Sequence, residues 1–136
     1  MQTRPILIVE DDLAICTLLQ ALMQHRGYDC DVVRDGDEAI RKLRRNDYAA
    51  ILLDLMLPGT FGFDVIRFLD AERPAMSSRV IVLTAACPAT LRHFDASTIR
   101  TVMHKPIDVH ELAAHVDACA SLDNTLATRA PSPAPI

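Results

Sequence analysis

Three carboxylates in the first half of the chain come directly after apolar runs. Glu10 and Asp11 follow Ile6–Val9, and Asp54 follows Ile-Leu-Leu. An acidic side chain beside such a run is costly to bury unless it is paired or coordinated. These three residues are therefore candidates for a functional site.

Two more polar residues, Thr84 and Lys105, end strand-like runs later in the chain. Crowded carboxylates repel one another, so either one stays protonated or a cation lies among them. Oxygen ligands without sulfur or imidazole favour Mg²⁺. A carboxylate close to Mg²⁺ and an ammonium group can attack a phosphoryl group and form an acyl phosphate. The hydroxyl of Thr84 could then hydrogen-bond the product.

These residues must meet in space, and the hydrophobic pattern predicts elements that would bring them together. The expected strands are Ile6–Val9, Tyr28–Val33, Ala49–Leu53, Val80–Leu83 and Ile99–Met103. The expected helices are the segment from Asp12 to Gly27, then Glu38–Arg45, Phe63–Ala71, Pro88–Asp95 and a last helix capped by Asp108. Strands and helices alternate, and continuous apolar runs are typical of strands buried on both faces of a parallel sheet.

This alternation predicts an α/β fold of the flavodoxin-like, doubly wound kind. We expect a five-stranded parallel sheet in the order 2-1-3-4-5 with five helices. Ligands of such sheets bind at the carboxyl ends of the strands, near the point where the strand order reverses. Asp11 and Asp54 would face one cleft there, with Thr84 and Lys105 on the other side of Asp54.

Length and composition limit the organisation. The chain has 136 residues, half of them apolar, and a formal net charge of -4, which predicts one globular domain over residues 1–120. Ser121–Ile136 contains three prolines and is expected to be a mostly disordered tail. A basic cluster is interpreted as a solvated helix face rather than a phosphate-backbone site. Its members are Arg41, Lys42, Arg44 and Arg45.

The cysteines and the apolar runs indicate the compartment. Four scattered cysteines form no CxxC pair, so we expect reduced thiols in a cytoplasmic protein. They are Cys16, Cys30, Cys87 and Cys119. A strand-like segment begins almost at the N-terminus, which argues against a targeting peptide. No apolar run approaches the ~18 residues of a membrane span.

The candidate residues lie in four short blocks. They read Ile-Leu-Ile-Val-Glu10-Asp11-Asp12, Leu-Leu-Asp54-Leu-Met-Leu-Pro58-Gly, Val-Leu-Thr84-Ala85 and His-Lys105-Pro106. In this order, over roughly residues 5 to 120, the blocks resemble those of response-regulator receiver domains of two-component signalling, including single-domain chemotaxis receivers.

The resemblance implies a metal-assisted phosphoacceptor site. Asp54 would accept the phosphoryl group, Asp11 would ligate Mg²⁺, and Glu10 would assist through water. The backbone carbonyl of Met56 would be a further ligand. Asp12 is expected to be a helix N-cap instead of a ligand.

The resemblance also implies how the signal is passed on. Thr84 would move toward the phosphoryl group, Lys105 would pair with a phosphoryl oxygen, and Lys105-Pro106 would be a cis peptide. Receivers usually carry an aromatic residue three positions before the lysine, whereas this chain has Val102. Phe61 also stands where an aspartate is usual. We expect the output face to be the fourth helix, fifth strand and last helix, including Phe94, Thr101 and His110.

The implied partners are proteins. A histidine kinase or phosphotransfer protein would donate the phosphoryl group, and a downstream target protein would bind the switched surface. We expect no direct contact with nucleic acid or membrane, a monomer or weak dimer, and no turnover catalysis beyond self-phosphorylation and slow self-dephosphorylation.

Other interpretations are open. Asp54, Glu10 and Asp11 could be capping carboxylates, and Lys105 an ordinary surface lysine. The histidines are expected at the surface rather than on a metal; they are His93, His104, His110 and His115. A haloacid-dehalogenase-like hydrolase would need an aspartate at Met56. A nucleotide- or flavin-binding module would need glycines where the acidic block stands. A pseudo-receiver that binds partners without phosphorylation is the main alternative.

Overall fold

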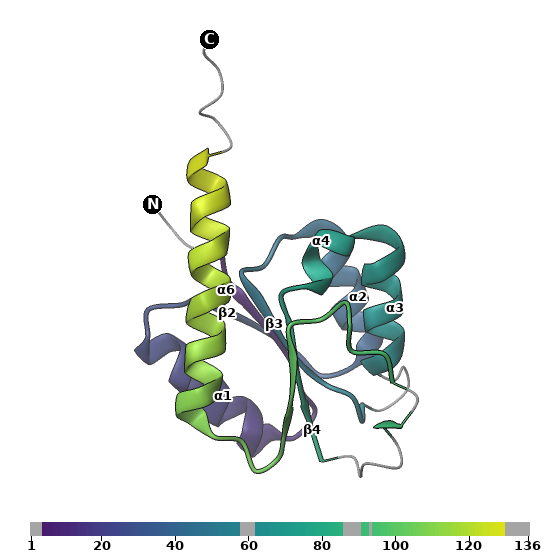
Figure 1. Cartoon of the computed structure of the whole chain (residues 1–136). Helices are drawn as coiled ribbons and strands as arrows, with labels where there is room; N and C mark the ends of the chain where they lie inside the picture. The colour runs from purple at the N-terminus through teal and green to yellow at the C-terminus, as the bar shows by residue number, and fades with distance from the viewer. Residues whose placement is uncertain (1–3, 58–61, 86–90, 93, 130–136) are drawn as a thin grey trace.

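The structure is a computed structural model, and it describes residues 4–57, 62–85, 91–92 and 94–129. A parallel sheet of five strands forms the centre, in the order β2-β1-β3-β4-β5 (Figure 1). The strands are β1 (Ile6–Val9), β2 (Cys30–Val33), β3 (Ala50–Asp54), β4 (Val80–Thr84) and β5 (Thr101–His104). All neighbouring pairs run parallel. The predicted architecture and strand order are confirmed.

Helices cover both faces of this sheet (Figure 1). The helices among the described residues are α1 (Leu13–His25), α2 (Gly36–Arg45), α3 (Gly62–Glu72), the short α4 (Pro74–Ser77) and α6 (Val109–Arg129). Helices α1 and α6 pack on one face, and α2 and α3 pack on the other. Their arrangement leaves the carboxyl ends of the strands as the edge where loops gather.

The alternation of side chains along the strands builds two cores. In β1, Leu7 and Val9 belong to the core under α2 and α3, whereas Ile6 and Ile8 belong to the core under α1 and α6. All four side chains are buried. Strands β3 and β4 are buried along their whole length like β1, as continuous apolar runs indicate. The edge strands β2 and β5 are only partly buried.

Aspartates begin the helices next to the site. The Asp12 carboxylate accepts hydrogen bonds from the backbone amides of Ala14 (2.9 Å) and Ile15 (3.2 Å) and caps α1, as predicted. Asp108 accepts from the amides of His110 (2.9 Å) and Glu111 (3.1 Å) at the start of α6. These caps fix where both helices leave the carboxyl edge of the sheet.

Some predicted boundaries differ from the structure. Strand β5 starts at Thr101 instead of Ile99, because the amide of Ile99 closes a turn to the carbonyl of Ala96 (3.4 Å). The short helix α4, which Pro74 opens, was not predicted. Helix α6 continues through residues 121–129, which belong to the segment expected to be a mostly disordered tail. That stretch has neither glycine nor proline to end a helix.

Several sequence expectations fall outside the described residues. They concern Pro58 and Gly59, Phe61, Cys87, His93, half of the helix predicted over Pro88–Asp95, and residues 130–136. Within the described part, no helix is long and apolar enough to cross a membrane. Three of the four cysteines are described, and they are free thiols: Cys16, Cys30 and Cys119.

Candidate phosphoacceptor site

The residues singled out by their chemistry meet at one edge of the sheet. Glu10 directly follows β1, Asp54 is the last residue of β3, Thr84 is the last residue of β4, and Lys105 directly follows β5. Because the strands are parallel and in register, these ends lie next to one another. Glu10 and Asp54 are almost completely buried, with exposed fractions of 2% and 5%.

Two buried carboxylates share the ammonium group of Lys105. Its Nζ atom lies 2.9 Å from Glu10 Oε1 and 3.4 Å from Asp54 Oδ2. Burial raises the pKa of Glu10, the bond to Lys105 opposes this, and the charge of Asp54 adds to it. Burial acts to lower the pKa of Lys105, but the two carboxylates outweigh it and raise that pKa. The lysine therefore stays charged while the carboxylates compete for it.

A third carboxylate makes the site an acidic cluster. Carboxylate oxygens of Glu10, Asp11 and Asp54 all lie within 4.8 Å of one another, with Asp11 on the exposed side. Among the described residues, this is the group of His, Cys, Asp or Glu that could hold a metal ion. Its donors are all oxygen and one is open to solvent, which fits Mg²⁺ with its retained waters. Three of the four predicted metal residues, Glu10, Asp11 and Asp54, therefore fit the ion chemically.

Backbone amides orient two of these carboxylates. The second oxygen of Glu10 accepts from the amides of Asp11 (3.1 Å) and Asp12 (3.3 Å). The Oδ1 atom of Asp54 accepts from the amide of Met56 (3.0 Å). Asp54 thus has one oxygen on the backbone and the other facing Lys105, so its orientation is set before any reaction.

Thr84 and Lys105 are joined through the backbone. The Thr84 side chain is buried, and its carbonyl accepts from the Lys105 amide at 2.8 Å. The Lys105-Pro106 peptide bond is cis, as the sequence predicted. The end of β4 and the turn after β5 are therefore coupled next to Asp54.

Two contributors to the site were not found from the sequence. Gly62 begins α3, and a Cβ there would lie 2.6 Å from Leu55 Cα and 2.7 Å from the Asp54 carbonyl oxygen. Arg34 donates to the Asp11 carbonyl at 3.2 Å. A glycine just after the loop was a usable signal for the first. Nothing local in the sequence marks the second, because its partner is 23 residues away.

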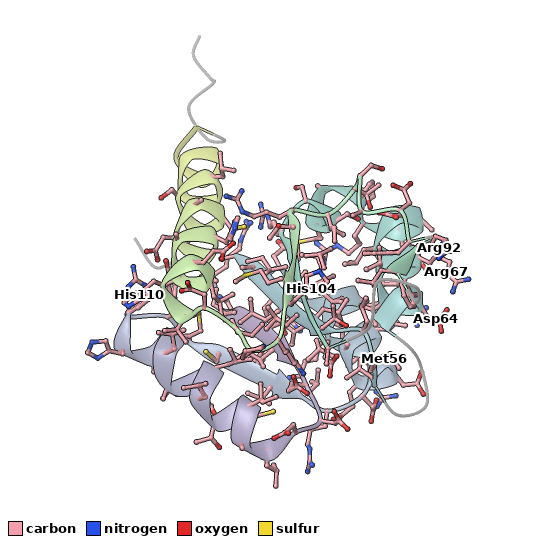
Figure 2. The ribbon with its side chains drawn as sticks, turned by 60° about the horizontal axis from the view of Figure 1, so that its bottom comes forward. Met56, Asp64, Arg67, Arg92, His104 and His110 are labelled. Carbon is pink, nitrogen blue, oxygen red and sulfur yellow. The ribbon has the colours of Figure 1, made fainter. Side chains whose placement is uncertain are left out.

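No described histidine and none of the predicted output residues Phe94, Thr101 and His110 belongs to the acidic cluster. Figure 2 shows His104 and His110 on the side of β5 and α6, and Met56 on the side of α3. His115 accepts a hydrogen bond from Arg100 at 3.1 Å and is not exposed as expected, but partly buried. Val102 is partly buried against the core under α2 and α3. On that side, the Phe63 and Phe94 rings meet edge to face, 5.2 Å apart.

Comparison with known proteins agrees with this geometry. The response regulator receiver domain model matches residues 6–117. The chain belongs to this family, and is a receiver domain of the kind found in two-component response regulators.

The relatives are longer than this chain. It is 32% identical over 130 residues to the transcriptional regulatory protein YkoG of Bacillus subtilis, covering 92% of this chain and 54% of YkoG. It is 36% identical to ResD of the same species, covering 83% of this chain and 46% of ResD. The chain thus spans about half the length of the curated relatives it matches.

Among solved structures, the receiver domain of the sensor histidine kinase PA1611 from Pseudomonas aeruginosa has a TM-score of 0.78 and 28% identity. The match covers 88% of this chain and 99% of that domain, whose active-site cleft coordinates a magnesium ion.

Proposed function

We propose that Asp54 accepts a phosphoryl group from a histidine kinase or phosphotransfer protein, and that phosphorylation switches a surface that binds a downstream protein. The observation that carries this proposal is the arrangement around Asp54. One oxygen is held by the Met56 amide, and the other faces Lys105 in a cluster with Glu10 and Asp11.

The chemistry is a single displacement at phosphorus. An Asp54 carboxylate oxygen forms the new bond to phosphorus as the bond to the donor imidazole breaks, and the imidazole keeps that electron pair. Lys105 then pairs with a phosphoryl oxygen in place of its present carboxylate contacts. Glu10, Asp11, Asp54 and the Met56 carbonyl would hold Mg²⁺, which when bound offsets negative charge on the transferred oxygens.

Exposed apolar side chains near the site support a protein donor. Leu13, the first residue of α1, is 63% exposed, and Met56 is 50% exposed. Leu13 directly follows Asp12, the N-cap of α1, and Met56 comes two residues after Asp54. A macromolecular donor can cover such side chains while it presents its phosphohistidine.

The switch is proposed to run through Thr84 to the region of Phe94. The Thr84 hydroxyl would hydrogen-bond the phosphoryl group and draw the end of β4 toward Asp54. Val102 offers no ring to follow this movement. The Phe63–Phe94 contact supports a different connection, because it joins the start of α3, just after the Asp54 loop, to the segment after β4. Phe94, Thr101 and His110 would then belong to the output face. Loss of partner binding on substituting them would support this assignment, and intact binding would refute it.

The test of the phosphoacceptor role is intact-protein mass after incubation with acetyl phosphate and Mg²⁺. The expected result is the gain of one phosphoryl group, abolished by Asp54→Asn and by EDTA. If the folded protein gains no phosphoryl group from acetyl phosphate or from a phosphorylated histidine kinase, the pseudo-receiver alternative is favoured.

A further inference from the structure

Helix α2 carries four cationic side chains in its last two turns, and their surroundings differ. Arg44 lies 3.9 Å from the Glu72 carboxylate, and its guanidinium lies 5.2 Å from the centre of the Phe68 ring. Arg41, Lys42 and Arg45 are exposed and form no ion pair with any other residue in the described parts of the chain. In the described parts of the chain, three charges on one helix face therefore remain outside any ion pair.

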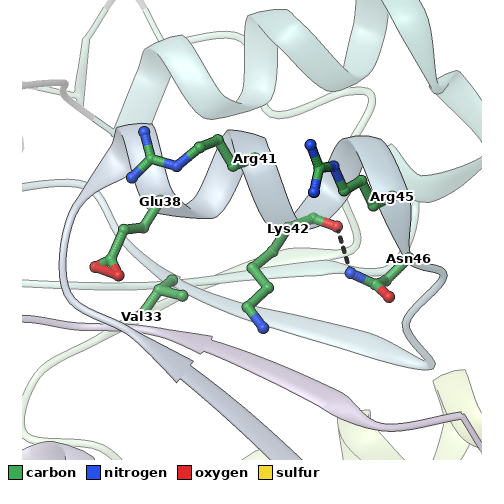
Figure 3. Close-up of a pocket in the computed structure, with 6 residues that line it drawn as sticks. All are labelled: Val33, Glu38, Arg41, Lys42, Arg45 and Asn46. Carbon is green, nitrogen blue, oxygen red and sulfur yellow. Dashed lines mark hydrogen bonds between the residues drawn. The ribbon is translucent and has the colours of Figure 1, made fainter.

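These three side chains line a groove of about 430 Å³ (Figure 3). Its other lining residues are Val33 at the end of β2, Glu38 and Asn46. Figure 3 shows Glu38 at the Val33 end of the groove, and the Asn46 amide donating to the Lys42 carbonyl at 3.0 Å at the other end. The groove is therefore bounded by one carboxylate and is cationic along the rest of its length.

The groove lies at the edge of the sheet opposite to the proposed output side. Strand β2 is one edge strand and β5 is the other. Within the described chain, no residue of α2 belongs to the acidic cluster or forms an ion pair with Lys105. A ligand in this groove would therefore leave both the phosphoacceptor site and the β5 side free.

The charge of the whole chain decides which polyanion fits. The formal net charge of the chain is -4, so the protein as a whole repels a polyanion. A long nucleic acid bound to the three groove cations would extend past them and meet this repulsion. Charges act over only about 8 Å at physiological salt. A short acidic segment that ends within the groove is attracted by the three cations, while the more distant negative charges of the chain are screened. The aliphatic stems of the arginines and the lysine also offer apolar contact to a peptide.

We propose that this groove docks an acidic segment of a partner protein, whose carboxylates pair with Arg41, Lys42 and Arg45. The contact does not depend on phosphorylation and goes beyond the phosphoacceptor function. It would attach the receiver to a partner at the β2 edge while the other edge responds to Asp54.

The experiment uses the full chain and a fluorescein-labelled peptide of alternating glutamate and serine. Fluorescence anisotropy at low salt should show binding that weakens as salt is added. Amide shifts in the NMR spectrum should concentrate on α2. The variant R41A/K42A/R45A should weaken binding by about tenfold or more, since each exposed ion pair contributes about a twofold to fivefold effect.

The matched control is R44A/R67A/R92A, which removes the same number of charges outside the groove. It should change the peptide affinity by less than about twofold. Because the three groove residues are exposed, their variant should fold, and the single variant Lys42→Ala provides a second measure. Absence of binding, equal weakening in the control, or tighter binding of a DNA duplex through the same three residues would each overturn the proposal. Asp54→Asn should bind the peptide as the wild type does.

Discussion

The two ends of the sheet use the same kinds of charged side chain for different purposes. At the carboxyl end, Glu10 and Asp54 share the ammonium group of Lys105, and Asp11 lies close to both carboxylates, so negative charge is in excess. At the amino end, Arg73 donates to the Leu43 and Asn46 carbonyls at 2.7 and 2.8 Å and pairs with Asp47. Arg79 donates to the Tyr48 carbonyl at 2.7 Å.

The two ends differ in whether their charged groups are fully paired within the fold. At the amino end the arginines satisfy backbone carbonyls and hold loops together, which is a structural role. At the carboxyl end the carboxylates outnumber their cation, which is an arrangement that a metal ion could balance. Charge alone therefore does not mark the site; the imbalance of charge does.

The largest expected effect is on the reaction at the carboxyl end. Lys105→Met keeps the apolar stem and removes the one ammonium group beside Asp54. Phosphorylation by acetyl phosphate should slow by about 10²-fold, because a preorganised charge on the transferred oxygens is lost. Arg73→Met is the control at the amino end and should leave this rate unchanged. A Lys105→Met rate within about twofold of the wild type would contradict the role given to Lys105.

The next effect is on stability at the same end. Gly62→Ala places a Cβ atom 2.6 Å from Leu55 Cα, and this backbone contact cannot be relieved by a side-chain rotation. The free energy of unfolding in urea should fall by about 3 kcal/mol. At Gly27, where φ is +90° and no atom lies within 4 Å of the added Cβ, alanine should cost only about 1 kcal/mol. Equal costs at both glycines would show that the contact with Leu55 is not limiting.

A smaller stability effect is expected at the amino end. Arg73→Met removes the hydrogen bonds to two carbonyls and the pair with Asp47. Urea unfolding should show a loss of about 2 kcal/mol, since bonds from charged donors contribute more than neutral ones. The phosphoryl gain at Asp54 should be complete in this variant. If Arg73→Met were as stable as the wild type, the hydrogen bonds of Arg73 would not be needed to hold these loops together.

The smallest effect is a pH dependence of opposite sign at the two ends. The bond to Arg73 holds the pKa of Asp47 below its ordinary value of 3.8, so its stabilising contribution is present above that pH and is lost as the pH falls through the lowered pKa. Burial raises the pKa of Glu10 above its ordinary value of 4.5, so its contribution favours folding at low pH and is lost as the pH rises through the raised pKa.

Urea midpoints measured across the acid range, with EDTA present, test both signs. In Asp47→Asn, the stability lost on acidification should be smaller than in the wild type by less than about 1 kcal/mol, since the Asp47–Arg73 pair is partly exposed. Glu10→Gln should remove the opposite trend. If both variants shifted the profile in the same direction, the contrast between the two ends would be wrong.

The sequence predicts most of the fold and which polar residues meet at the carboxyl edge of the sheet, for identifiable reasons. Carboxylates that follow buried runs, and the caps Asp12 and Asp108, are local signals that survive folding unchanged. The closer pairing of Lys105 with Glu10 than with Asp54 could not be predicted, because it joins residues 95 positions apart and depends on side-chain geometry. The extension of α6 past residue 120 was missed because the three prolines near the end of the chain suggested disorder for all of residues 121–136, although residues 121–129 contain neither glycine nor proline.

The most direct test of the central claim identifies the residue that carries the phosphoryl group. The phosphorylated protein is treated with borohydride, which reduces an acyl phosphate to the alcohol, and its peptides are sequenced by mass spectrometry. Homoserine is expected at position 54, formed only after phosphorylation and absent in Asp54→Asn. Reduction at Asp11 or Glu10 instead, or a phosphoryl group that borohydride does not remove, would contradict Asp54 as the phosphoacceptor.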